Sequence, residues 1–205
     1  MHYKKYTLPN GLRIILAPMQ ETETVTVLVM TGVGSRYETR AENGLAHFLE
    51  HMFFKGTEKR PTVLDISKEL DAVGAEYNAY TGKDRTAYYA KVEAHHADTA
   101  LDVVSDIFMN AKLDQAEIDR ERGAILQEIN MYEDTPARHI HDLWESHLYG
   151  DTPLGWEIIG PKSNIKSFQR RDVLNYLSRG YVACNVVVGV SVKIDRKKLN
   201  KMIDE

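Results

Sequence analysis

The residues best suited to chemistry lie in one short segment, 44–54, with the sequence GLAHFLEHMFF. His47 and His51 are four positions apart, so on a helix their side chains project from the same face. At that spacing both imidazoles can reach one Zn²⁺ at about 2.0–2.1 Å. Glu50 shares this face and can accept a proton from a water whose pKa the metal has lowered, then pass it to a leaving amine. The segment predicts a metal-dependent hydrolase; a chance pair of surface or core histidines is the alternative.

A catalytic zinc site needs a third protein ligand and leaves its fourth position to water. Glu121 and Glu128 are seven residues apart, which on a helix gives them nearly the same azimuth. This pattern suits one ligand and one supporting carboxylate, but it also suits an amphipathic helix with solvated glutamates paired to arginines. Periodicity does not choose among the rival ligands, which are His95, His96, His139, His141 and His147.

Strand-like and helix-like segments that would position these residues follow one another along the chain. Strands are expected at 3–8, 12–17, 24–31, 75–80, 86–92 and 185–192. Helices are expected at 45–54, 63–73, 97–109, 115–132, 137–149 and 171–178. An Asn10–Gly11 turn should join the first two strands, and Asp114 should cap the helix that begins at Gln115. The order predicts an α+β fold, a two-layer sandwich of a largely antiparallel sheet packed by helices, forming a single domain over 1–205.

The helix expected at 97–109 has an apolar stripe of period 3.6, which should face the core. The residues of this stripe are Ala100, Val103, Val104, Ile107 and Phe108.

Composition excludes several classes of protein. The chain has 205 residues, 43% of them hydrophobic and 27% charged, which is typical of a globular protein. A net charge of -4 provides no broad surface for nucleic acid. No secretory signal and no run of about 18 apolar residues is visible, so we expect no membrane association and a cytoplasmic location. The basic cluster near the end is interpreted as a solvated tail and comprises Arg196, Lys197, Lys198 and Lys201.

Cys184 is the single cysteine and cannot form an internal disulfide. The valines at 186–188 predict a strand in which it behaves as a small hydrophobic residue. This cysteine usage fits a reducing compartment.

The motif His-x-x-Glu-His reverses the usual zinc-peptidase order. With it, the chain resembles the family of pitrilysin, insulin-degrading enzyme and mitochondrial processing peptidase, and most closely the bacterial processing-peptidase-like members. The matching segments cover nearly the whole chain and lie at 8–12, 34–38, 44–57, 78–81, 121–128, 153–155 and 160–161.

The resemblance implies a processing-peptidase-like metallohydrolase domain with one zinc ion per chain. In that family the third ligand is a glutamate separated by 76 residues from the second histidine, and Glu128 has that spacing from His51. The implied ligands are thus His47, His51 and Glu128, with Glu50 as the catalytic residue. Glu121 is implied as an outer carboxylate that supports the site.

The resemblance also implies an edge strand that pairs with an extended peptide substrate through Asn78, Ala79 and Tyr80. The bare sequence has a simpler interpretation, in which the tyrosines cover the two faces of a sheet. These tyrosines are Tyr77, Tyr80, Tyr88 and Tyr89.

Family members are built from two similar halves, and this chain matches only the first. The resemblance therefore implies a zinc endopeptidase that needs a second homologous domain or chain, which a homodimer would also supply. A non-catalytic or peptide-binding half-domain is one alternative. The remote alternative is an enzyme like S-ribosylhomocysteine lyase, which uses a cysteine as third metal ligand and would need Cys184. No motif indicates the substrate sequence.

Overall fold

A computed structural model describes residues 3–19 and 21–193, so the predicted tail at 196–201 lies outside the described residues. One six-stranded sheet has the order β1-β2-β6-β3-β5-β4. Every neighbouring pair is antiparallel except β2 and β6, which are parallel. The strands are β1 (Lys4–Thr7), β2 (Arg13–Pro18), β3 (Thr24–Thr31), β4 (Glu76–Thr81), β5 (Thr86–Glu93) and β6 (Val186–Val192). The predicted α+β class with a largely antiparallel sheet is confirmed.

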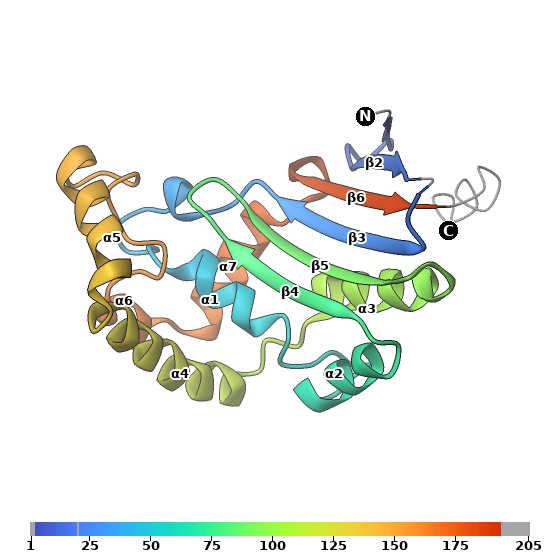
Figure 1. Ribbon diagram of the computed structural model, residues 1–205. Helices are drawn as coiled ribbons and strands as arrows, with labels where there is room; N and C mark the ends of the chain where they lie inside the picture. Colours follow the sequence, from blue (N-terminus) through green and yellow to red (C-terminus); the bar gives the residue numbers. More distant parts are fainter. Residues whose placement is uncertain (1–2, 20, 194–205) are drawn as a thin grey trace.

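The helices pack mainly against one face of this sheet, as Figure 1 shows. They are α1 (Leu45–Met52), α2 (Val63–Ala72), α3 (Ala97–Asn110), α4 (Gln115–Glu133), α5 (Pro136–Tyr149), α6 (Lys162–Ser167) and α7 (Arg170–Gly180). On β3, alternation buries Val25, Val27 and Val29 while the residues between them are half-buried, the pattern of a sheet with one covered face. Helix α3 packs against β3 and β5, and α1 lies beside β4 and β5.

The first two strands form the predicted hairpin. Gly11 takes φ +86°, and its amide donates to the Leu8 carbonyl at 2.9 Å. The Asn10 side chain accepts a hydrogen bond from Leu12 N at 3.0 Å. Gly11 thus provides the left-handed backbone of the turn, and the Asn10 side chain closes it.

Three details differ from the sequence predictions. Helix α6 was not predicted, because six residues are too few to show a period. Asp114 occupies the N-cap position of α4, but its side chain makes no capping hydrogen bond, and its backbone carbonyl accepts from Glu117 N and Ile118 N instead. Cys184 lies before β6 in the 3-10 turn Ala183–Asn185 and is exposed, so it is not a residue of the apolar strand.

The predicted stripe of α3 does face the core. Ala100, Val103, Val104 and Ile107 are buried, and Phe108 is half-buried at its margin. Within the described part of the chain, no helix is both long and apolar enough to cross a membrane.

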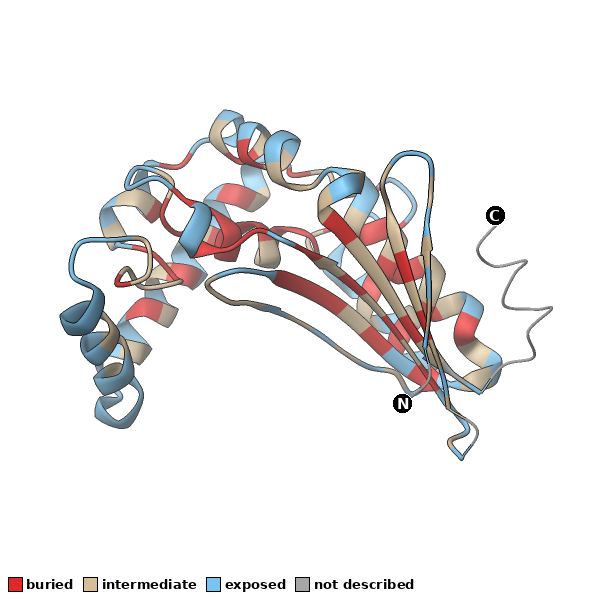
Figure 2. Ribbon diagram, turned by 90° about the horizontal axis from the view of Figure 1, so that it is seen from above, coloured by how far each residue is buried: buried red, intermediate tan, exposed pale blue. Residues whose placement is uncertain are grey.

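Helix α5 differs from the other long helices because none of its residues is buried, and Figure 2 shows it exposed at one end of the molecule. Large apolar side chains that are about half exposed nevertheless recur along it. They are Ile140, Leu143, Trp144, Leu148 and Tyr149.

Candidate metal centre

Helix α1 is fixed by its apolar residues. Leu45, Phe48, Leu49 and Met52 are at most 1% exposed. Their burial leaves one helix face for the polar residues of the motif, and that face is directed toward α4 and β4. The helix therefore has little freedom to rotate, which fixes the direction of its two histidines.

Helix α4 lies against α1 through a second apolar face. Ile118, Ile125 and Ile129 are buried at helical spacing, and packing of this face turns Glu121 and Glu128 toward α1. Two segments far apart in the sequence thus bring their polar residues to one point.

Three candidate ligand atoms meet at that point. His47 Nε2 lies 3.3 Å from His51 Nε2. Glu128 Oε2 lies 3.4 Å from His51 Nε2 and 3.8 Å from His47 Nε2. Among the described residues, these three form the one group of histidine, cysteine and acidic side chains placed to hold a metal ion, with ligand atoms within 4.8 Å of one another.

This donor set fits zinc. A tetrahedral zinc ion with bonds of about 2.0–2.2 Å separates neighbouring ligand atoms by about 3.3–3.5 Å, close to two of the three distances. Burial, with the neighbouring His51, lowers the pKa of His47 to about 3. His47 is consequently neutral at pH 7, the form that can bind a metal.

Glu121 lies behind His51 rather than at the meeting point. Its Oε1 is 2.7 Å from His51 Nδ1, and its Oε2 is 2.6 Å from Lys55 Nζ. Burial alone would raise the pKa of Glu121, but these two hydrogen bonds outweigh burial and the pKa lies below its usual value. An ionised Glu121 accepts the Nδ1 proton, and this tautomer leaves the Nε2 lone pair of His51 directed at the metal position.

Glu50 lies on the same face of α1 and is held by β4. Thr81 Oγ1 donates to Glu50 Oε2 at 2.5 Å. Burial raises the pKa of Glu50, although the Thr81 hydrogen bond opposes the shift. A carboxylate with a raised pKa can both accept and return a proton near neutral pH.

Tyr132 and Arg138 also belong to the site, and the sequence did not point to them. Tyr132 OH donates to Glu128 Oε1 at 2.5 Å, while Oε2 of the same carboxylate faces the histidines. Arg138 Nη2 donates to Tyr132 OH at 2.9 Å, and its guanidinium lies 3.8 Å from the centroid of the tyrosine ring. Burial and Glu128 raise the pKa of Tyr132 to about 12, which keeps it a donor. The sequence could have indicated Tyr132 by its spacing, because it follows Glu128 by one helical turn.

A pocket of about 450 Å³ opens beside the three ligand atoms. Ala79 and Tyr80 of β4 line it, together with His141 and Asp142 of α5 and the segment 157–159. The structure does not bring Asn78 to this pocket. Asn78 lines a smaller hollow of about 250 Å³ with Phe54 and Tyr77. The roles of the three β4 residues stay predictions.

The other candidate histidines are not part of this group in the described structure, although His141 lines the pocket beside it. His95 pairs with Glu93 at 3.1 Å, and His139, His141 and His147 belong to α5. Cys184 is not part of the metal-ligand group in the described structure.

The model of the insulinase family, peptidase family M16, matches residues 13–162. The chain belongs to this family, as the motifs predicted. It is 40% identical over 191 residues to the uncharacterized zinc protease YmxG of Bacillus subtilis, covering 93% of this chain and 46% of that relative. It is 41% identical over 184 residues to the beta subunit of the mitochondrial-processing peptidase of Mus musculus, covering 90% of this chain and 37% of that relative.

The fold is similarly close to that of a solved protease. The crystal structure of a protease from Helicobacter pylori superposes with a TM-score of 0.92 at 26% identity, covering 98% of this chain and 49% of that one. The chain thus spans about half the length, or less, of the relatives it matches.

Proposed function

We propose that the chain is the metal-binding half of a zinc-dependent endopeptidase that cleaves extended peptides. The observation that carries the proposal is the convergence of His47, His51 and Glu128 within 4.8 Å, beside a pocket that Glu50 also lines. These three residues would hold one zinc ion per chain. When bound, zinc lowers the pKa of a coordinated water to about 7 and polarises the scissile carbonyl.

The residues of the chain supply the proton transfers. Glu50 accepts a proton from the attacking water and later donates it to the leaving amine. Thr81 holds Oε2 of Glu50, and Oε1 is left for the transfer. Glu121 takes no part in bond making; it orients His51 and keeps the correct imidazole tautomer.

The substrate would bind to β4. Among the described strands it pairs only with β5, so it forms one edge of the sheet and can accept an extended peptide as a further strand. Asn78, Ala79 and Tyr80 would contact that peptide. Ala79 N donates to Asn78 Oδ1 at 2.9 Å, so the Asn78 side chain must release this amide when a peptide pairs with it.

The partner would be a second homologous domain or chain. Relatives about twice as long support this proposal, as do the exposed apolar residues of α5 next to the pocket. A homodimer is the other way to cover that helix, and the mass of the chain in solution distinguishes the two. A non-catalytic half-domain has less support, because Glu50 is present and lies at the site.

The test is hydrolysis of a quenched fluorescent, unstructured peptide with and without a chelator. Cleavage that the chelator abolishes and added zinc restores supports a peptidase. Zinc binding without cleavage, even after the second half of a close relative is added, would favour the non-catalytic alternative.

A further inference from the structure

Glu38 is a buried carboxylate outside the metal-binding motif. It is 3% exposed and follows the 3-10 turn Ser35–Tyr37, which connects β3 to the segment before α1. No lysine, arginine or histidine in the described ranges forms an ion pair with it. A buried carboxylate without a cation requires hydrogen bonds, and those that Glu38 accepts within the described residues come from one place.

That place is the beginning of α1. Glu38 Oε2 accepts from Gly44 N at 2.9 Å, and Glu38 Oε1 accepts from Ala46 N at 2.7 Å. The first amides of a helix have no partner within the helix, and the positive end of the helix dipole favours a carboxylate there. Glu38 therefore acts as the N-cap of α1 from a distance.

The helix cannot supply this cap itself. Its N-cap residue is Gly44, with φ +106° and no side chain. A Cβ on Gly44 would lie 2.8 Å from the Ile159 carbonyl oxygen, so close packing excludes a serine, threonine or aspartate at this position. The missing capping group is thus replaced by Glu38.

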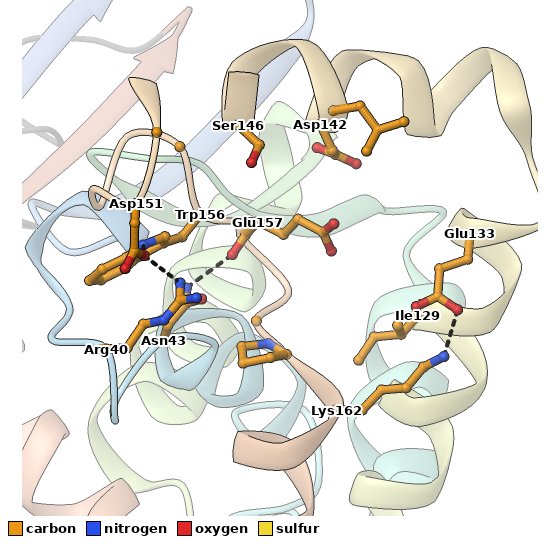
Figure 3. A pocket seen from close by; sticks show the side chains of 15 residues that line it. Arg40, Asn43, Ile129, Glu133, Asp142, Ser146, Asp151, Trp156, Glu157 and Lys162 are labelled. Atoms are coloured by element: carbon orange, nitrogen blue, oxygen red, sulfur yellow. Dashed lines mark hydrogen bonds and ion pairs between the residues drawn. The ribbon is translucent and has the colours of Figure 1, made fainter. Parts of the chain in front are cut away.

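Asn43 extends the contact to the wall of the pocket. Its Nδ2 donates to Glu38 Oε2 at 3.2 Å and to the Glu157 carbonyl at 3.0 Å. Figure 3 shows this second contact at the edge of an adjacent cavity of about 560 Å³. Glu157 and the two residues after it line the pocket beside the ligand atoms. Glu38 consequently contacts the helix that carries both histidines. Through Asn43 it is also connected to Glu157 in the pocket wall.

We propose that Glu38 is a positioning residue of the metal centre, which fixes the start of α1 and hence the direction of His47 and His51. Ala46, whose amide Glu38 accepts, directly precedes His47. Loss of this acceptor would loosen the first turn of the helix while its apolar residues keep it in the core. The inference rests on the proposed zinc site.

The test compares Glu38→Gln with Asp106→Asn. The glutamine keeps the shape, but its amide nitrogen cannot accept, so one helix amide loses its partner. Asp106 is a control because it is also a buried, hydrogen-bonded carboxylate and belongs to a different cluster. Zinc affinity is measured by competition with a chromophoric chelator at a temperature where both variants are folded. Amide exchange at Gly44 and Ala46 is measured in the zinc-free chains.

Glu38→Gln should weaken zinc binding by about tenfold or more and speed exchange of these two amides. Asp106→Asn should lower the melting temperature and leave both measurements unchanged. Unchanged zinc affinity in Glu38→Gln, or equal weakening in the two variants, overturns the inference. If Glu38→Gln does not fold, Glu38→Asp replaces it: the shorter carboxylate cannot reach both amides and should show a smaller loss. Absence of zinc from the wild-type chain would refute the proposed function, while amide exchange would still test the cap.

Discussion

The described structure contains two clusters of titratable residues that are buried or half-buried, and they are arranged in opposite ways. One is the candidate metal centre between α1 and α4. The other surrounds Arg60, which is 2% exposed and donates to Glu69, Asp102 and Asp106 at 2.5–2.7 Å. Burial acts to raise the pKa of both aspartates, but hydrogen bonds outweigh it and hold both values below the usual range. The donors are Lys59 and Arg60 for Asp102, and Thr57, Asn110 and Arg60 for Asp106. Each of these three carboxylates therefore contacts a cation.

At the candidate metal centre, burial is the largest influence on the pKa of two groups. It lowers the pKa of His47 and raises that of Glu50, so burial shifts each group toward its neutral form. His47 Nδ1 is buried and has no hydrogen-bond partner within the described residues. A cluster whose charged groups pair with one another stabilises a fold. A cluster whose lone pairs converge without a cation is instead suited to bind a cation.

The largest expected effect is on turnover. Glu50→Gln removes the group that accepts and returns the proton, so hydrolysis should fall by about 10²–10⁴-fold, while zinc remains bound. Peptide cleavage and metal content are measured on the same sample. Glu117→Gln, a glutamate of α4 paired with Arg120, is the control and should have no effect. Loss of zinc in Glu50→Gln would show that this residue is a ligand rather than the base.

The Arg60 cluster should respond in stability and not in metal binding. Arg60→Met leaves Asp106 buried without its cation, which should cost about 3–5 kcal/mol. Denaturant unfolding gives the free energy, and zinc content should be unchanged below the transition. A variant that kept its stability but lost zinc would show that the Arg60 cluster supports metal binding rather than the stability of the fold.

Glu121 should have an intermediate effect. Glu121→Gln weakens the partner of His51 Nδ1, and loss of such outer partners commonly lowers metal affinity about 10–100-fold. Chelator competition measures the dissociation constant. Glu69→Gln, which removes a charge facing Arg60, should not change it. Equal zinc affinity in Glu121→Gln would mean that this carboxylate only pairs with Lys55.

The smallest effect should be a shift in pH dependence. The Thr81 hydrogen bond stabilises the ionised form of Glu50, so Thr81→Val should raise the pKa of Glu50 further. The base is then protonated at higher pH, and the acidic limb of the rate profile should move upward. The full profile of kcat against pH measures this. A limb that moves downward, or stays in place, would separate Thr81 from the proton transfer.

The sequence predicted those parts of the site that depend on local spacing. Histidines four apart on a helix share a face wherever the helix lies, and the alternating valines of β3 indicated a strand with one buried face. Periodicity could not select Glu128 among several acids and histidines, because that choice depends on how α4 crosses α1. The prediction of Glu128 came instead from its spacing to His51, which matches the spacing in the family.

The groups that the sequence missed come from elements brought together only by tertiary packing. Thr81 reaches Glu50 because β4 lies beside α1, and Glu38 reaches α1 because a glycine occupies the usual cap position. Neither contact has a periodic signature. The short α6 lacks one for a different reason, since it ends before a second turn is complete.

The most direct test of the account is the zinc content of the purified chain after dialysis, measured by elemental analysis for the wild type, Glu128→Ala and Asp106→Asn. One zinc per chain in the wild type and in Asp106→Asn, with loss in Glu128→Ala, is the predicted result. Full zinc content in Glu128→Ala, or none in the wild type, would contradict the assignment of His47, His51 and Glu128 as the metal ligands.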